Sequence, residues 1–450
     1  MKQVLWFRRD LRITDSAILQ YAKDEVLPIF IFDKNILNLL SKDDKRVTLI
    51  YKSVLNLKKQ LKEIGLDLAI FYSTPQEVFS KLKNEGFENI LCSIDFDDYA
   101  KKRDDEISKI IPMQTFTDSF ITHPNDCLKA DGTPYKVFTP YYKNLSFIWD
   151  SYRLEEFKAN ENLKLISFDY EFIPALEDMN FTAQKLPDFL EKSADELLKE
   201  FEQKIENYKV DRDFFDKNAT SNLAVHLRFG LIGPRELFNK IKSLKARTEN
   251  KEFFIRELFW REFYNYILFH FPRSEFENLN GIDVNWNEDE EVFQKWCEGK
   301  TGVPIIDAAM QYFNQTGTMH NRLRMIVSSY LTKNLLVDWK KGERYFASKL
   351  LDYEASSNIG SWQWAASTGA DSVPYFRIFN PYLQSAKFDK EAIFIKSVLK
   401  ELKDMPAKQI HSENGVQSNI FLNYPAQIVS IEFSRKRAIL EFKRANNEKN

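Results

Sequence analysis

The stretch KQVLWFRRDLR, residues 2–12, decides the fold of the first part of the chain. In it a short apolar run, Val4–Phe7, ends directly in charged residues, which is typical of a buried strand in a parallel sheet. Similar runs follow at Leu27–Phe32, Leu68–Tyr72 and Ile90–Ile94. Charged amphipathic stretches separate the runs, and such alternation indicates parallel βα units. We therefore expect a doubly wound α/β domain over residues 1–125, with room for a ligand at the carboxyl edge of its sheet.

The rest of the chain has a different pattern of hydrophobic residues. Between residues 126 and 190 the periodicity fades among prolines and aromatic residues, which indicates an ordered connector between two domains. Over residues 191–450 strand signals vanish and helical periodicity takes over, as in Ile305–Phe313. Pro304 and Gly317 bracket this segment in the positions that favour the first turn and the end of a helix. The second domain is therefore expected to be all-α.

Composition and charge exclude several classes of protein. Lys and Arg number 64 and Asp and Glu 66, so no overall basic charge indicates a polyanion partner, although a local basic patch fits within this balance. No apolar run approaches the ~20 residues of a membrane span, and the start of the chain lacks the pattern of a secretory leader. The cysteines and histidines lack the spacing of a disulfide framework or a metal site. They are Cys92, Cys127, Cys297, His123, His226, His270, His320 and His411. We expect a cytoplasmic globular protein without a metal.

Tryptophans concentrate in the helical part of the chain. Six of the eight lie between residues 260 and 364, namely Trp260, Trp286, Trp296, Trp339, Trp362 and Trp364. Core packing is one explanation for such a cluster. The other is a flavin or nucleobase partner, because indole planes stack on heterocycles and pass single electrons. The residues around the tryptophans have to decide between the two.

A basic tract lies in the same region. From His320 to Lys349 seven Lys or Arg residues stand against two acidic residues, Asp338 and Glu343. A solvated helix face is one interpretation. Arg322 and Arg324, which stand beside aromatic neighbours, favour the other interpretation, contact with phosphates. A basic face on a nearly neutral protein fits DNA.

A carboxylate and an indole share one face of an expected helix. Glu257 and Trp260 are three residues apart on the helix that begins near Glu252, so their side chains lie together. We expect Glu257 to be buried among aromatic residues such as Phe253 and Phe254, where its ionised form is disfavoured. A group in that setting suits a single hydrogen bond to a substrate base. The alternative is an ordinary surface glutamate.

Long motifs show which family the chain resembles. They are WFRRDLR (6–12), DGTPYKVFTPYY (131–142), WCEGKTGVPIIDAAM (296–310), MHNRLRM (319–325) and SWQWAASTGADSVPYFRIFNP (361–381). With these motifs the chain resembles the DNA photolyase/cryptochrome family nearly from end to end, and most of all its class I cyclobutane pyrimidine dimer photolyases. The resemblance implies an N-terminal α/β antenna domain and a C-terminal helical domain that encloses FAD. This architecture matches the βα alternation of residues 1–125 and the helical periodicity of residues 191–450.

The resemblance also implies a light-dependent repair enzyme, a carbon–carbon lyase that acts on UV-damaged DNA. In that family reduced FAD transfers an electron to a flipped-out cyclobutane pyrimidine dimer, the dimer splits into monomers, and the electron returns. One alternative is a blue-light-sensing cryptochrome that binds flavin without repair. Another is a repair enzyme confined to single strands. We expect a monomer that does not bind membranes.

Residue by residue, the resemblance assigns four sets of functional positions. Dimer contact falls on Glu257, Trp260, Asn321 and Met325, and Asn358 faces flavin N5. Photoreduction of the flavin falls on Trp286, Trp339 and Trp362. FAD binding falls on Tyr208, Thr220, Ser221, Asn222, Leu223, Ala224, Arg324, Asp352, Tyr353, Glu354 and Asn358. DNA binding falls on Arg212, Glu257, Trp260, Arg261, Asn321, Arg322, Arg377 and Gln384.

Several positions depart from the family pattern. Asn222 and Ala224 stand where the family often has arginine and usually has serine, and Glu354 stands where it often has aspartate. We still expect FAD to bind, because backbone N–H groups of the preceding turn meet its phosphates. Tyr99 and Ala100 stand where pterin-using relatives carry an amide and an acid, so a folate antenna is not expected. A second chromophore of the deazaflavin or flavin type stays open.

Overall fold

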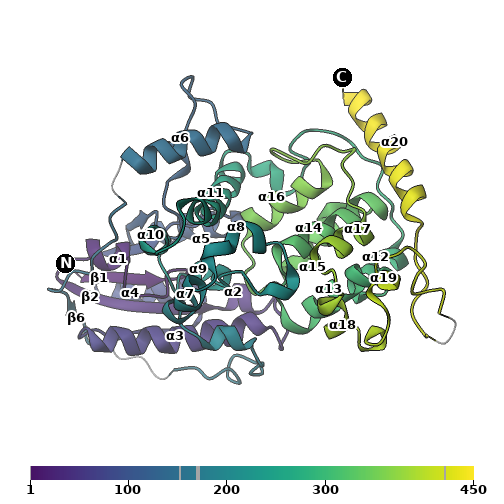
Figure 1. Cartoon of the computed structure of the whole chain (residues 1–450). Helices are drawn as coiled ribbons and strands as arrows, with labels where there is room; N and C mark the ends of the chain where they lie inside the picture. The colour runs from purple at the N-terminus through teal and green to yellow at the C-terminus, as the bar shows by residue number, and fades with distance from the viewer. Residues whose placement is uncertain (1, 152–153, 169–172, 420–421, 450) are drawn as a thin grey trace. The chain divides into compact units, whose positions relative to one another are not determined.

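The computed structural model describes residues 2–151, 154–168, 173–419 and 422–449 (Figure 1). The chain forms two compact units that interleave along the sequence, each with a hydrophobic core of its own. The first unit consists of Met1–Leu128, Lys143–Gln203 and Ser221–Lys251. The second consists of Lys129–Tyr142, Lys204–Thr220 and Glu252–Asn450.

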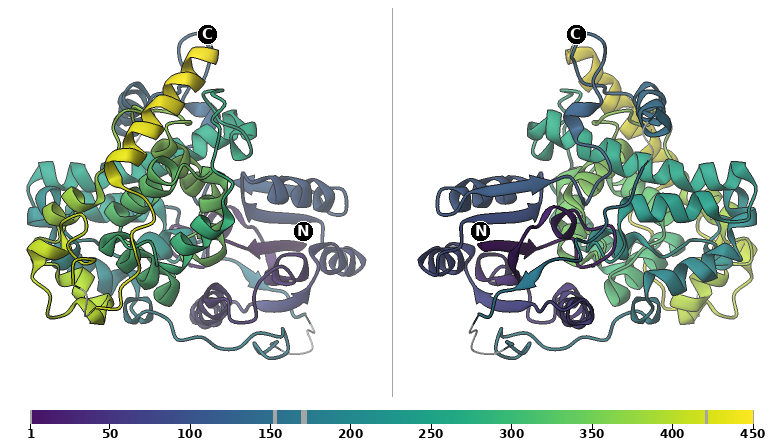
Figure 2. Two further views of the ribbon diagram at one scale, coloured as in Figure 1. Left: turned by 90° about the vertical axis from the view of Figure 1, so that its right-hand side faces the viewer. Right: turned by 90° about the vertical axis from the view of Figure 1, so that its left-hand side faces the viewer.

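A parallel sheet organises the first unit. Its strands are β1 (Lys2–Phe7), β2 (Glu25–Asp33), β3 (Ala69–Ser73), β4 (Asn89–Ser93), β5 (Met113–Phe116) and β6 (Lys164–Leu165). The strand order is β3-β2-β1-β4-β5, all pairs are parallel, and β6 pairs with the start of β2. Helices cover both faces of the sheet (Figure 2). The apolar runs form strands because both faces of the sheet are buried, and the predicted doubly wound α/β fold is confirmed.

Most helices of the first unit begin at a side chain that caps the helix. They are α1 (Ala17–Tyr21), α2 (Lys34–Leu37), α3 (Lys45–Glu63), α4 (Pro75–Asn84), α5 (Asp98–Ser108), α7 (Ala194–Glu202), α9 (Ala224–Arg228) and α10 (Pro234–Ser243). At the start of α4, Thr74 and Glu77 form a capping box in which each side chain accepts from the other residue's backbone N–H. The chain passes between the units within α6 (Phe138–Ser151) and α11 (Thr248–His270).

Hydrogen bonds explain why the units do not follow the predicted boundaries at residues 125 and 190. Trp149 Nε1 donates to Thr122 Oγ1 at 2.8 Å. Arg12 Nη1 donates to the carbonyl oxygen of Gly230 at 3.3 Å. Parts of the expected connector (126–190) and of the expected helical domain (191–450) thus pack within the same unit as the sheet. The boundaries of the functional domains remain a prediction.

The described residues of the second unit form helices joined by loops and contain no strand, as predicted. Its helices are α8 (Tyr208–Asp211), α12 (Glu290–Glu298), α13 (Pro304–Thr316), α14 (Asn321–Ser329), the π-helix η6 (Tyr330–Asn334), α15 (Trp339–Lys349), α16 (Ala355–Ala366), α17 (Pro381–Phe388), α18 (Ile393–Val398), α19 (Ala407–Ile410) and α20 (Ile431–Lys449). Pro304 opens α13 and Gly317 ends it with a φ of 73°, a left-handed conformation that suits glycine. In the hydrophobic core of the unit, helices α13 to α16 pack together with Trp296, Trp339 and Trp362.

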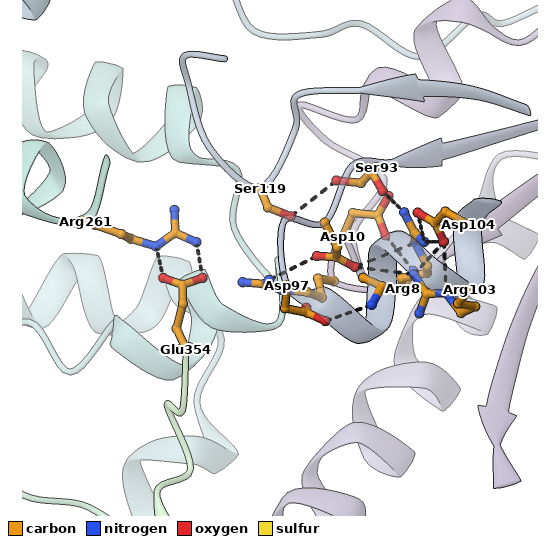
Figure 3. A network of polar contacts seen from close by, with 12 residues as sticks. Arg8, Asp10, Ser93, Asp97, Arg103, Asp104, Ser119, Arg261 and Glu354 are labelled. Atoms are coloured by element: carbon orange, nitrogen blue, oxygen red, sulfur yellow. Dashed lines mark hydrogen bonds and ion pairs between the residues drawn. The ribbon is translucent and has the colours of Figure 1, made fainter. Parts of the chain in front are cut away.

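Charged residues at the carboxyl edge of the sheet pair with one another (Figure 3). Arg8, directly after β1, donates through Nη1 to Asp104 at 2.7 Å, and its backbone N–H donates to Asp10 at 2.7 Å. Arg9 Nη1 lies 3.0 Å from Asp95, which follows β4. Strands β1 and β4 meet where the strand order reverses, the point at which open α/β sheets bind ligands. A chromophore at this edge remains a prediction.

Membrane-spanning helices and metal clusters are absent from the described residues. No helix there is both long enough and apolar enough to cross a membrane. No group of three or more His, Cys, Asp or Glu side chains is placed there to hold a metal ion.

Candidate functional site

Helix α11 presents Glu257 and Trp260 one turn apart. The Glu257 carboxylate accepts a hydrogen bond from Arg212 Nη1, directly after α8, at 2.6 Å. The Glu257 side chain is 36% exposed, so the expected burial among aromatic residues is wrong. Arg212 binds the carboxylate, and solvent reaches it. The ion pair fixes the direction of an accessible acceptor.

The Trp260 indole lies flat against Phe138, the first residue of α6. The ring centroids are 3.6 Å apart and the planes differ by 4°. On the Phe138 ring lies the guanidinium of Arg256, 5.3 Å from its centroid. Trp260 is still half-buried, so part of the indole remains accessible. Nothing in the sequence predicts this stack, although Phe138 stands within the motif 131–142.

Helix α14 carries the next two expected dimer contacts. Asn321 is its first residue and is exposed, and Met325 follows one turn later, half-buried. His320 caps the helix, because its Nδ1 accepts the backbone N–H of Arg322 at 3.2 Å. Burial lowers the pKa of His320 to about 4, so its imidazole is neutral near pH 7. Arg322 Nη2 pairs with Asp213 at 2.7 Å.

Two expected flavin contacts form an ion pair. Arg324 Nη2 lies 2.8 Å and 3.0 Å from the two carboxylate oxygens of Asp352. The donors of Arg324 and the acceptor oxygens of Asp352 complement the carbonyl and N–H groups along the pyrimidine edge of a flavin. The chemistry of these residues therefore fits FAD.

Glu343, a residue for which the sequence predicts no role at the site, fixes the side chain of Asn358. The Asn358 Nδ2 donates to Glu343 twice, to the backbone oxygen at 3.2 Å and to Oε1 at 3.0 Å. Burial raises the pKa of Glu343, while hydrogen bonds from Asn358 and Tyr353 oppose the shift. Asn358 itself is 8% exposed. The amide is therefore fixed in one orientation by a side chain on α15.

Glu354 binds Arg261 at two points (Figure 3). The carboxylate lies 2.9 Å from Arg261 Nε and 3.1 Å from Nη2, and both side chains are largely buried. Glu354 stands where the family often has aspartate. Its ion pair with Arg261 links the start of α16 to α11. The DNA contact expected of Arg261 and the FAD contact expected of Glu354 remain predictions.

The three expected electron-transfer tryptophans lie in the core of the second unit or against it. Trp362 packs on Gly342 of α15, where a Cβ would lie 2.3 Å from the indole Cη2. Trp339 stands one turn earlier on α15 and donates from Nε1 to Asn278 Oδ1 at 2.7 Å. Trp286 is partly buried, with its ring centroid 6.0 Å from that of Phe442. Close packing of α15 on α16 thus brings Trp339 and Trp362 to neighbouring turns.

The expected phosphate-binding tract begins at Thr220 in the second unit and continues in the first. Asn222 has a φ of 58°, and Leu223 precedes α9 without a side-chain cap. Ala224 is the exposed first residue of that helix. The role of these residues remains a prediction, as do those of Tyr208, which is buried, and of Arg377 and Gln384.

The basic tract from His320 to Lys349 does not form one basic face. Lys333 is fully buried and donates to the carbonyl oxygen of Ala366 at 3.0 Å. Lys341 pairs with Glu290 at 2.8 Å. The tract runs through α14, η6 and α15, and its buried and paired lysines do not add to the basic face that was expected.

Two family models match the chain. One, described as DNA photolyase, matches residues 3–161, and the other, described as the FAD binding domain of DNA photolyase, matches residues 254–444. The chain is 35% identical to a deoxyribodipyrimidine photo-lyase of Alkalihalophilus pseudofirmus, over 99% of this chain and 98% of the relative. It is 32% identical to that of Escherichia coli, over 99% of each.

Solved structures have the same fold. A photolyase from Sulfolobus tokodaii, solved with two FAD molecules, has a TM-score of 0.84 and 32% identity, and the match covers 99% of this chain and 100% of that one. A class III photolyase from Agrobacterium tumefaciens has a TM-score of 0.85 and 28% identity, with 99% and 98% covered. A Synechocystis cryptochrome at 24% identity shares the fold, with a TM-score of 0.87 and 98% and 99% covered. The chain belongs to the DNA photolyase family, and its residues 254–444 match the FAD-binding domain of that family.

Proposed function

We propose that the protein splits cyclobutane pyrimidine dimers in DNA under light. The observation that carries this proposal is the half-exposed Glu257 carboxylate, held by Arg212 one turn from the Trp260 indole. A fixed acceptor beside an aromatic plane suits a pyrimidine lesion with apolar ring faces and N–H groups on its edge. Membership of the photolyase family supports the same chemistry.

The flavin would be held by residues of the second unit. Arg324 and Asp352 would bind its pyrimidine edge, and the Asn358 amide, fixed by Glu343, would lie toward N5. When bound, reduced FAD supplies the photoexcited electron that opens the dimer and accepts it back afterwards. Trp286, Trp339 and Trp362 would carry the electrons that keep the cofactor reduced.

The dimer would leave the duplex to reach this site. Its weakened pairing and stacking lower the cost of flipping, which is a few kilocalories per mole. Trp260, backed by Phe138, would stack on the flipped bases, and Glu257 would accept a hydrogen bond from a pyrimidine edge. Asn321 and Met325 would border the lesion from α14. The site then recognises the lesion by shape and edge contacts.

Phosphate contacts would supply the remaining affinity for DNA. Arg212, Arg322 and Arg377 are the arginines that we assign to them, with Gln384 as a neutral contact. Contacts to phosphates carry no sequence information, so binding is expected to depend on salt and little on sequence. We expect the protein to act as a monomer.

The proposal is tested with the purified, photoreduced protein and a duplex that contains one thymine dimer. Illumination should restore the pyrimidine absorbance, and a dark sample should not. Glu257→Gln should lower the quantum yield of splitting, with Glu252→Gln, an exposed residue on the same helix, as its control. A bound flavin without any splitting would overturn the proposal in favour of a light sensor.

A further inference from the structure

A pocket of about 450 Å³ opens in the second unit, and Gln384 is the one expected site residue among those that line it. It is lined by η6, the segment leading into α17, α17 itself and the start of α20. The lining residues are Asn334, Ile378, Phe379, Asn380, Leu383, Gln384, Ile431 and Arg435. Four apolar side chains, three amides and one arginine thus form its wall, and no carboxylate is among them.

Two amide oxygens at the pocket have no hydrogen-bond partner among the described residues. Asn334 is fully buried, and its Nδ2 donates to Ser434 Oγ at 2.8 Å while its Oδ1 accepts nothing. Gln384 is half-buried, and its Oε1 is also unsatisfied. An unsatisfied buried acceptor is costly, so two beside one pocket point to a ligand that brings N–H donors.

The charges near the pocket point to phosphate. Arg435 lines it and Arg377 directly precedes Ile378, and both are exposed. Neither guanidinium has an ion pair in the part of the chain that the structure describes. Arg212 and Arg322, in contrast, are paired with carboxylates. Two unpaired arginines beside an apolar pocket suit a nucleotide, with its base inside and its phosphates at the rim.

Helix α17 connects the pocket with the site proposed above. Gln384 lies on its first turn and Phe388 at its end, about 6 Å further along the axis. The guanidinium of Arg322, an expected phosphate contact, lies 4.7 Å from the Phe388 ring centroid. A DNA strand at Arg322 is therefore within reach of the pocket.

We propose that this pocket receives an adenine from the strand opposite the dimer. The inference rests on the proposed function, because a flipped thymine dimer leaves its two adenines without partners. The adenine N6 amino group donates and N7 accepts, and a glutamine amide offers the matching oxygen and N–H. Gln384 would read this edge, and Phe379 would cover the ring.

The test compares two duplexes that share the same dimer strand. One carries adenines opposite the dimer, and the other carries purine, which lacks the 6-amino group. Binding is measured by fluorescence anisotropy, and splitting under light is followed on the same samples. The wild type should bind the adenine duplex about tenfold more tightly, as expected for one bidentate base contact. Purine pairs more weakly with thymine, so easier flipping alone would produce the opposite preference.

The variant Gln384→Leu should bring the ratio of the two dissociation constants close to one. Gln409→Leu, at an exposed glutamine elsewhere in the second unit, should keep the ratio near ten. A wild-type ratio of one, or a Gln384→Leu variant that weakens both duplexes equally, would overturn the adenine pocket while light-dependent splitting still supports the proposed function. Absence of splitting in both duplexes would instead overturn the proposed function itself, and with it the pocket's assignment to DNA.

Discussion

The two units use arginine–carboxylate pairs in different surroundings. In the first unit Arg12 is 3% exposed and binds Asp118, which is fully buried. In the second unit Arg212 and Arg322 also have carboxylate partners, but about a fifth of each arginine side chain is exposed, 20% and 19%. The residue types are the same, and the access of water differs.

The exposure of an arginine–carboxylate pair indicates its role. Buried pairs stabilise the fold, and partly exposed pairs are the ones that we expect a ligand to open. A buried pair has lost its hydration, so removal of one partner leaves an uncompensated charge in the interior. A partly exposed pair is screened by solvent and contributes little to stability. We therefore expect that a DNA phosphate replaces Asp213 at Arg322 at small cost, and that Arg12 keeps Asp118 as its partner.

The largest effect should come from breaking the buried pair. Arg12→Ala removes the donor to Asp118 and to the carbonyl oxygen of Asp15, and should lower the free energy of unfolding by about 3–5 kcal/mol. Urea denaturation measures the loss. The control is Arg273→Ala, whose side chain is 83% exposed in its pair with Glu277 and should lose at most ~0.5 kcal/mol. Equal losses in the two variants would show that burial does not distinguish the pairs.

The second effect concerns His320, which lies beside the partly exposed pairs. Its pKa is about 4 in the folded protein and 6.5 in the unfolded chain, so the unfolded chain binds the proton first. Stability contributed by the neutral imidazole is complete above pH 6.5 and is lost as the pH falls toward 4, by about 3 kcal/mol in total.

Denaturation between pH 4 and pH 7 measures this dependence. His320→Asn keeps a side chain that caps helices well and removes the titrating group, so its stability should vary less over this range. A variant with the pH dependence of the wild type would place the sensitivity elsewhere.

The fold was predictable wherever local sequence determines it. Strands β1 and β4 are apolar runs of four or five residues between charged segments, and the bracketing of α13 by Pro304 and Gly317 is equally local. The surroundings of Glu257 were not predictable in the same way. They depend on Arg212, which stands 45 residues earlier and reaches the carboxylate only in the folded unit.

The roles of the residues that support the site could not be predicted from the sequence, for a related reason. Glu343 is one of two acids in a basic tract of the sequence, yet it holds the Asn358 amide from a neighbouring helix. Phe138 stacks on Trp260 across a sequence distance of more than a hundred residues. A single sequence contains the identity of such residues but not the packing that pairs them.

The third prediction tests the aromatic part of the second unit. Trp260→Ala should weaken binding of dimer-containing DNA by about 1–3 kcal/mol, the usual contribution of a base stacked on an aromatic side chain. Anisotropy with damaged and undamaged duplexes measures the loss, which should be confined to the damaged one. Phe147→Ala, at an exposed phenylalanine, is the matched control. Equal weakening of both duplexes would mean that Trp260 supports the protein rather than the lesion.

The smallest effect should come from the Arg322–Asp213 pair, which DNA is expected to open. The salt dependence of DNA binding should show this effect more clearly than the dissociation constant at one salt concentration. Arg322→Gln should weaken binding to damaged and undamaged DNA alike, because a phosphate contact carries no information about the lesion. The slope of log K against log salt concentration should become shallower by about one, since one counterion fewer is released. Lys52→Gln, at an exposed pair with Glu191 in the first unit, should leave the slope unchanged. If Arg322→Gln also leaves the slope unchanged, its guanidinium stays with Asp213 in the complex, and partial exposure alone does not make an ion pair available to DNA.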